Sequence, residues 1–331
     1  MPGFWRKLFG GRDVSSGTQV RPGRLQQGTA SSLHGWLHVA PAIWPGRDYL
    51  LYVPSRAARW RSLPLIVLFH GCRQTPEAIF EGTGIAALAD RLPAYVLIPR
   101  QQDRANEWQC WNWFDGRTVA GQGEAAIVAA MIRKASRWRR VDRERSIAAG
   151  MSAGAALAAV VGMRYPELVA GVFTHSGIAV GAASSPFTAM TVMRRGPDTD
   201  VADIASRARA ASTSPRTVAL LALVGTADGV VAPRNSAALA RQFLAFNQID
   251  VPAGAQSSLP AADRDEHDRT DFHHGVRTRE WTRNGVPAVR LVEIDALEHA
   301  WSGGDPAFPF HDATGPDATG MLEEWMSAIS R

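Results

Sequence analysis

Short apolar runs alternate with longer amphipathic stretches along most of this chain. Six runs have strand length and are apolar at nearly every position, which is typical of parallel strands covered on both faces: residues 63–69, 95–99, 146–149, 168–175, 217–224 and 289–294. Residues 46–54 alternate between polar and apolar and predict an earlier strand. Residues 120–138, 155–162 and 233–246 predict helices. Strands that alternate with helices predict an α/β fold with a mostly parallel sheet in one domain.

The remaining segments are more polar. Residues 13–32 are rich in Ser, Gly, Thr and Gln and predict a linker, so we divide the chain into a flexible tail at 1–32 and one domain at 33–331. Residues 180–215 are irregular and receive no assignment. Residues 250–285 carry Pro, Gly, Asp and His and predict an insertion or a long surface loop.

Composition and charge narrow the classes of function. The 331 residues are 46% hydrophobic and 20% charged, with a net charge of +5, as in an ordinary globular protein. Five arginines cluster between residues 137 and 145, where a predicted helix ends. Cations suit the C-terminal end of a helix dipole, which favours a solvated helix end over a nucleic-acid site. No apolar run approaches 18 residues, so no transmembrane helix is expected.

The N-terminal residues 1–12 place charges inside their only apolar cluster. That pattern is not a convincing signal peptide. Phe4, Trp5, Leu8 and Phe9 could form a short amphipathic anchor on a membrane or a polymer granule. A flexible tail is the favoured interpretation.

The segment Gly150-Met151-Ser152-Ala153-Gly154 follows a predicted strand and precedes a predicted helix. It fits the G-x-S-x-G nucleophile elbow, in which a sharp strand-to-helix turn exposes the serine. Glycines flank the serine in such a turn because a Cβ atom at either place would clash. The alternative is a packing turn made of small residues.

A serine hydroxyl needs a base and a group that orients the base. Asp228 lies in a turn after the predicted strand 217–224, and His299 lies in a loop after the strand 289–294. Asp228 alone could equally be a helix cap or an Asx turn. The order Ser152, Asp228, His299 is the order that this fold requires, so together they predict a catalytic triad. His175, His273, His274 and His311 match no base position, and we expect neither a metal nor an organic cofactor.

The oxyanion of a tetrahedral intermediate needs hydrogen-bond donors. The backbone N–H of Ala153 is one candidate, and the N–H of Cys72 or its neighbour, after the strand 63–69, is the other. His70 is expected to order that loop rather than to transfer protons.

Cys72 and Cys110 are the two cysteines of the chain. A disulfide between them would tie the oxyanion loop to an aromatic loop and would indicate an oxidising compartment, whereas two free thiols would fit the cytoplasm. The aromatic loop contains Trp108, Trp111, Trp113 and Phe114. We expect a substrate cleft with Trp111 and Trp113 on one wall and Trp301, beside His299, on the other.

Five ordered motifs resemble the poly(3-hydroxybutyrate) depolymerase family of esterases, which is close to feruloyl and acetyl xylan esterases. They are His-Gly-Cys at 70–72, Cys-Trp-Asn-Trp-Phe at 110–114, Gly-x-Ser-x-Gly at 150–154, Gly-Thr-Ala-Asp at 225–228 and His-Ala-Trp-Ser-Gly-Gly at 299–304. The resemblance covers roughly residues 35–310. Glu298 departs from it, because the family usually has Gly before this histidine.

The resemblance implies an α/β-hydrolase fold, a triad of Ser152, Asp228 and His299, a Cys72–Cys110 disulfide and, commonly, secretion. The expected function is hydrolysis of short 3-hydroxyalkanoate oligomers or polymer through an acyl-enzyme. The alternatives are a feruloyl or acetyl xylan esterase and a hydrolase-like binding or granule-surface protein without activity. An extracellular or periplasmic location is expected, with the cytoplasm as the alternative.

Overall fold

The structure is a computed structural model that describes residues 23–30, 46–57, 61–268 and 274–329. Its central feature, within those residues, is a ten-stranded sheet in the order β1-β2-β4-β3-β5-β6-β7-β10-β9-β8. The strands are β1 (Arg24–Ala30), β2 (Arg47–Val53), β3 (Leu65–Phe69), β4 (Tyr95–Pro99), β5 (Ile147–Met151), β6 (Gly171–His175), β7 (Ala219–Gly225), β8 (Arg264–Asp268), β9 (Val276–Arg283) and β10 (Val286–Ile294).

The middle of the sheet is parallel. β4, β3, β5, β6, β7 and β10 pair in parallel, whereas β1, β2, β9 and β8 add antiparallel pairs at the two edges. Every residue of β3, β4, β5, β6 and β7 is buried. The predicted α/β fold with a mostly parallel sheet is therefore confirmed.

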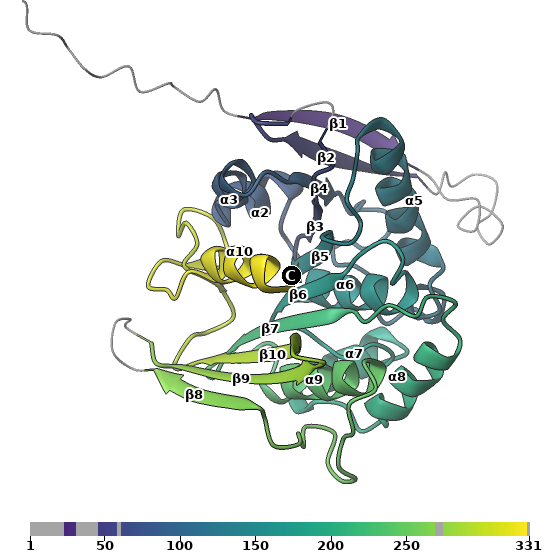
Figure 1. Cartoon of the computed structure of the whole chain (residues 1–331), viewed down its shortest axis with the longest axis vertical. Helices are drawn as coiled ribbons and strands as arrows, with labels where there is room; N and C mark the ends of the chain where they lie inside the picture. The colour runs from purple at the N-terminus through teal and green to yellow at the C-terminus, as the bar shows by residue number, and fades with distance from the viewer. Residues whose placement is uncertain (1–22, 31–45, 58–60, 269–273, 330–331) are drawn as a thin grey trace, which may run out of the picture.

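Helices cover both faces of the sheet (Figure 1). The helices are α2 (Pro76–Gly82), α3 (Ile85–Arg91), α4 (Gly116–Val119), α5 (Gly123–Trp138), α6 (Ala153–Arg164), α7 (Pro186–Arg195), α8 (Val201–Ala210), α9 (Arg234–Phe246) and α10 (Ala318–Ile329). Leu65, Val67 and Phe69 pack into one core with α5, α6 and α9, while Ile66 and Leu68 pack into the other with α2, α3 and α10. The unbroken apolar run of β3 thus contributes side chains to two cores, one on each face of the sheet.

The predicted linker is wrong at residues 24–30, which form the edge strand β1. The strand is held by its backbone ladder to β2 rather than by an apolar face. A Cβ atom at Gly28 would lie 2.4 Å from the Tyr49 ring, so the ring lies against the bare glycine. The β1 sequence Arg-Leu-Gln-Gln-Gly-Thr-Ala has no apolar alternation that would predict a strand. Phe4 and the rest of the proposed anchor lie outside the described residues.

Two further segments differ from the sequence prediction. Residues 180–215 contain α7 and α8, which begin at caps that the sequence does carry: Ser185 and Thr188 form a capping box, and Asp200 accepts two backbone N–H bonds. Residues 250–285, expected as an insertion or a long surface loop, contain β8 and β9. β8 is exposed at all five positions and pairs with β9, partly through the Asp265–Arg277 ion pair. A fully polar edge strand has no apolar alternation to reveal it.

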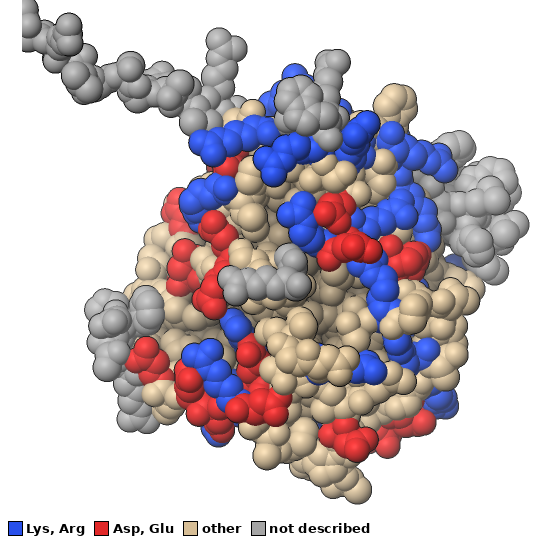
Figure 2. Space-filling model, in the orientation of Figure 1, with Lys and Arg blue, Asp and Glu red and all other residues tan. Residues whose placement is uncertain are grey.

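Two basic residues near the C-terminal end of α5 make structural contacts. Arg139 donates to the Gln26 side chain, and Lys134 donates to the Thr29 carbonyl, so both cations join α5 to β1. On the face in Figure 2, basic groups predominate over the upper part, and acidic and basic groups lie together lower down. Among the described helices, none is long and apolar enough to cross a membrane.

The N-terminal end of β5 depends on one buried serine. The Ser146 hydroxyl accepts from the N–H of Leu65 at 2.9 Å and donates to the carbonyl of Asp142 at 2.6 Å. We predict that Ser146→Ala lowers the free energy of unfolding by about 1–3 kcal/mol, because the buried N–H of Leu65 loses its partner. Urea unfolding followed by circular dichroism measures this. Ser136→Ala, on α5, removes a hydroxyl bonded only to its own helix and is the control; equal unfolding midpoints for both variants would contradict the prediction.

Candidate active site

Ser152 lies in a strained turn between β5 and α6. Its φ of 56° and ψ of −122° are outside the usual regions, and its N–H donates to the His175 carbonyl at 2.9 Å. A Cβ atom at Gly150 would lie 2.6 Å from the Gly154 carbonyl carbon, and one at Gly154 would lie 2.4 Å from the Phe69 oxygen. Both glycines are therefore required by close backbone contacts, as the sequence predicts for a nucleophile elbow.

Asp228 and His299 form a hydrogen-bonded pair. His299 Nδ1 lies 2.8 Å from Asp228 Oδ2 and must be the donor, because the carboxylate can only accept. The proton on Nδ1 leaves Nε2 as the basic nitrogen of the neutral ring. Asp228 Oδ1 accepts the N–H groups of Val230 and Val231 at 2.9 and 2.8 Å. The structure thus places an oriented imidazole where the sequence predicts the base.

The surroundings of Asp228 favour its ionised form. Burial alone would raise the pKa of this carboxyl group. The hydrogen bond and charge of His299, the N–H of Val231 and the hydroxyl of Ser176 outweigh burial and lower the pKa below its ordinary value. The Ser176 hydroxyl lies 2.7 Å from Asp228 Oδ2. Asp228 is therefore a negative charge at neutral pH, beside the ring that it orients.

The topology brings the three residues to one edge of the sheet. Ser152 follows β5, Asp228 follows β7 and His299 follows β10, while β6 lies between β5 and β7. These strands are parallel, so their carboxyl ends meet at the same edge. Ser152 and Asp228 contact the adjacent residues His175 and Ser176 at the end of β6.

The loop after β3 lies against the elbow. A Cβ atom at Gly71 would lie 3.6 Å from the Ser152 Cβ. Among the described hydrogen bonds of this loop, Gly71 donates its N–H to the Gln74 side chain and Arg73 donates to the Trp108 carbonyl. The N–H of Cys72 between them is therefore the loop's candidate oxyanion donor. Ala153 is the first residue of α6, where N–H groups have no partner within the helix.

His70 orders this loop. Its Nδ1 lies 2.8 Å from the Gly71 oxygen, and its Nε2 accepts the N–H of Gln101 at 3.2 Å. Burial lowers the pKa of His70 to about 4, so the ring is neutral with its proton on Nδ1. Both ring nitrogens are engaged, which fits a structural role rather than proton transfer.

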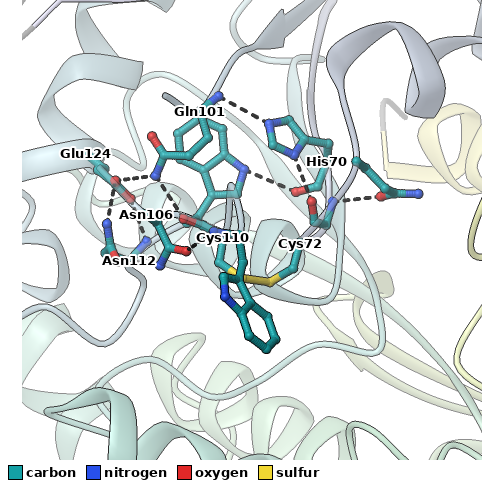
Figure 3. The surroundings of a disulfide bond; sticks show 11 residues. His70, Cys72, Gln101, Asn106, Cys110, Asn112 and Glu124 are labelled. Atoms are coloured by element: carbon teal, nitrogen blue, oxygen red, sulfur yellow. Dashed lines mark hydrogen bonds between the residues drawn. A yellow bond between two sulfur atoms is a disulfide. The ribbon is translucent and has the colours of Figure 1, made fainter. Parts of the chain in front are cut away.

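Cys72 and Cys110 form a disulfide with an S–S distance of 2.06 Å (Figure 3). The bond joins two residues that are 38 positions apart in sequence, and it links the candidate oxyanion loop to the segment that follows β4. Of the two alternatives that the sequence left open, the structure has the disulfide and not the free thiols.

Glu124, at the start of α5, anchors the same region. Its Oε1 accepts from Gln101 Nε2 at 2.5 Å and from Asn112 Nδ2 at 3.1 Å, and its Oε2 accepts the N–H of Asn112 at 2.7 Å. Gln101 Nε2 also donates to the Cys110 carbonyl. Burial raises the pKa of Glu124 despite these donors. In Figure 3, the Glu124 carboxylate accepts hydrogen bonds from Gln101 and Asn112 near the disulfide.

The three tryptophans expected to line a substrate cleft lie in the core, which corrects that expectation. Trp111, Trp113 and Trp301 are 1%, 4% and 0% exposed. Trp111 Nε1 donates to the His70 carbonyl, and Trp301 Nε1 donates to the Thr319 hydroxyl. The Trp111 and Trp301 indoles fill apolar space, and their N–H groups bond to acceptors inside the protein. Both therefore belong to the core beneath the site. The sequence shows that aromatic residues are frequent here, but not which way their rings point.

An exposed apolar ring beside His299 belongs to a residue that the sequence analysis did not single out. The Phe310 ring meets the His299 ring edge to face at 6.2 Å and is 39% exposed. Val230, two residues after Asp228, is 44% exposed. Trp108, 54% exposed, lies under the Arg73 guanidinium at 4.3 Å. Ser176 was also missed, although its place directly after a predicted strand was a usable signal.

A cavity of about 430 Å³ opens beside the Cys72 loop. Ser152, Asp228 and His299 do not line it. Most of the residues that line it have polar side chains, among them His70, Gln74, Arg100, Gln101, Asp103 and Gln109. Since none of Trp111, Trp113 and Trp301 lines it either, it is not the substrate cleft that the sequence predicted.

The parallel sheet and the elbow after β5 define an α/β-hydrolase fold. Among solved structures, an acetyl xylan esterase from Aspergillus awamori matches with a TM-score of 0.70 and 19% identity, over 92% of this chain and 99% of that one. The model of the Esterase PHB depolymerase family matches residues 47–266. The chain belongs to this family.

Curated relatives share part of the sequence. Poly(3-hydroxyalkanoate) depolymerase C from Paucimonas lemoignei is 30% identical over 250 residues, which cover 74% of this chain and 56% of that protein. Acetylxylan esterase A from Aspergillus oryzae is 28% identical over 134 residues, 40% of this chain and 42% of that protein. The chain spans about half the length of the curated relatives that it matches.

The carboxylate of Glu124 offers a test of the loop network. We predict that Glu124→Ala lowers the free energy of unfolding by about 2–4 kcal/mol, because the part-buried N–H of Asn112 and the buried Gln101 amide lose their shared acceptor. Urea unfolding of the oxidised protein measures the loss. Glu107→Ala, an exposed acid in the same loop, is the matched control and should change stability by less than about 0.5 kcal/mol. A loss no larger than that of the control would rule out the anchoring role.

Proposed function

We propose that this protein is a serine esterase that hydrolyses carboxylic esters through an acyl-enzyme. The observation that carries the proposal is the Asp228–His299 hydrogen bond of 2.8 Å, at the same sheet edge as the strained Ser152. A binding or granule-surface protein without activity would have no need of an oriented base or a strained serine. Membership of an esterase family supports the same conclusion.

In the proposed mechanism, His299 Nε2 takes the Ser152 hydroxyl proton while Oγ attacks the ester carbonyl carbon. The N–H groups of Cys72 and Ala153 donate to the oxyanion. Collapse of the tetrahedral intermediate releases the alcohol, which receives the proton from His299. Water then attacks the acyl-enzyme, with His299 as the base again, and releases the acid. Asp228 stabilises the imidazolium at both stages.

For the substrate, we propose esters of short 3-hydroxyalkanoates, as oligomers or polymer. The relative with the greatest matched length among those named is a poly(3-hydroxyalkanoate) depolymerase, and the exposed Phe310 and Val230 next to the catalytic pair provide apolar contacts for a short acyl chain. The second candidate is an acetylxylan-type ester. It is favoured by the sequence match to acetylxylan esterase A and by the polar residues that line the cavity beside the Cys72 loop.

We also propose that the protein works outside the cytoplasm. The Cys72–Cys110 disulfide supports this location, because structural disulfides persist in oxidising compartments. Association with polymer granules through residues 1–12 stays a separate proposal, since those residues are not described.

We predict that Ser152→Ala lowers kcat/KM for p-nitrophenyl butyrate by at least about 10⁴-fold, because no other group can form the acyl-enzyme. A fluorophosphonate probe should label the wild-type protein at Ser152 and leave the variant unlabelled. Ser146→Ala, a buried serine at the opposite end of β5, is the matched control and should be labelled like the wild type. Near-wild-type turnover by Ser152→Ala would refute the mechanism.

A turnover panel distinguishes the substrates. We expect the highest kcat/KM on hydroxybutyrate oligomers, lower values on acetylated xylan and methyl ferulate, and release of hydroxybutyrate from polymer film if polymer is attacked. Phe310→Ala should raise KM for hydroxybutyrate esters several-fold, because an apolar contact of one side chain contributes about 1–2 kcal/mol. A preference for acetylated xylan that Phe310→Ala leaves unchanged would favour the second candidate.

A further inference from the structure

Ser176 occupies a central position at the sheet edge that carries the candidate triad. It directly follows β6, between the strands that lead to Ser152 and Asp228, and it is fully buried. Its φ is 56°, and its N–H donates to the Leu223 carbonyl at 2.9 Å. A non-glycine residue held in the left-handed region by the surrounding structure is a common mark of a functional position.

The direction of each hydrogen bond around Ser176 follows from its partners. His175 Nε2 accepts the N–H of Ser302 at 3.3 Å, so the proton of the neutral ring is on Nδ1. Burial lowers the pKa of His175 to about 3, which keeps the ring neutral. Nδ1 lies 3.4 Å from Ser176 Oγ and donates to it. The Ser176 hydroxyl then directs its own proton to Asp228 Oδ2 at 2.7 Å.

Asp228 Oδ2 is therefore shared between two donors. Ser176 Oγ lies at 2.7 Å and His299 Nδ1 at 2.8 Å, while the N–H groups of Val230 and Val231 hold Oδ1. A carboxylate fixed on both oxygens keeps one rotamer. A second donor on Oδ2 also withdraws part of the negative charge that faces the imidazole. The chain of bonds starts at the N–H of Ser302, three residues after His299, and runs through His175 and Ser176 to Asp228. Asp228 also accepts from His299, so both ends of the chain meet the same loop.

We propose that Ser176 is a positioning residue of the Ser152–Asp228–His299 triad, with His175 setting the direction of its hydroxyl. The inference rests on the proposed esterase function. Ser176 touches neither the substrate nor the reacting atoms in this proposal. It acts through Asp228, by fixing the carboxylate and by moderating its pull on the protonated form of His299.

Ser176→Ala tests the proposal through the pH dependence of kcat/KM, which a general destabilisation of the fold would not shift. Alanine keeps the Cβ atom and therefore the same backbone strain. We expect kcat for p-nitrophenyl butyrate to fall about tenfold with KM nearly unchanged, because the carboxylate loses its fixed position. We also expect the acidic limb of the kcat/KM profile to move up by roughly half a pH unit, because a carboxylate with one donor fewer attracts the imidazolium more strongly.

The titratable groups that face this cluster are Asp228, His175, His299 and His311. The substitution replaces none of these residues. Ser176→Gly removes the same hydroxyl and relieves the positive φ, so it keeps the experiment decisive if the alanine variant folds poorly. It should move the limb in the same direction. Ser146→Ala, which removes an equally buried serine hydroxyl at the opposite sheet edge, should lose stability without moving the limb.

Wild-type kcat and an unmoved acidic limb in Ser176→Ala and Ser176→Gly would overturn the inference. A uniform fall in activity at every pH, with the limb unmoved, would overturn it as well, since it would show a purely structural role. Ser152→Ala separates this failure from that of the proposed function. If Ser152→Ala is inactive and the Ser176 variants are unaffected, only the inference about Ser176 is refuted. If Ser152→Ala is active, the proposed esterase mechanism itself is refuted.

Discussion

The close contact between the first turn of α6 and the end of β3 is the constraint on which the site depends. A Cβ atom at Gly154 would lie 2.4 Å from the Phe69 oxygen and 2.5 Å from the His70 oxygen, so only glycine allows the two backbones to meet. This contact sets the elbow and the Cys72 loop against each other. Both candidate oxyanion donors are backbone N–H groups, and their separation is therefore set by packing of the main chain rather than by flexible side chains.

Two buried carboxylates organise the loops around this contact in opposite electrostatic conditions. Asp228 has a lowered pKa, because charged and neutral donors on both oxygens outweigh its burial. Glu124 has a raised pKa, because its burial outweighs the amide donors that surround it. The first can therefore stabilise a cation that forms beside it during a reaction. The second is an acceptor for the Gln101 and Asn112 amides, and its contribution is to loop geometry.

How much the sequence could predict depended on how strongly each segment is constrained by its own residues. β4 has the predicted bounds, and the elbow strand and α9 differ by a residue or two, since their apolar periodicity reports burial directly. The order Ser152, Asp228, His299 likewise follows from loops after buried strands. β1 and β8 were missed because edge strands are held by backbone ladders. The tryptophans were misplaced because a sequence records that Trp111 is aromatic, but not which way its ring points.

The burial of those tryptophans separates the proposed chemistry from substrate selection. Ser152, Asp228 and His299 follow strands of the central sheet, whereas Trp111 and Trp301 are buried in the core. The exposed groups, Phe310 and Val230, belong to loops, which tolerate substitution with little effect on the sheet. The same fold is retained at 19% identity in an acetyl xylan esterase. One fold of this kind can carry different loops at the carboxyl ends of its strands, and the loops can differ without a change in the sheet.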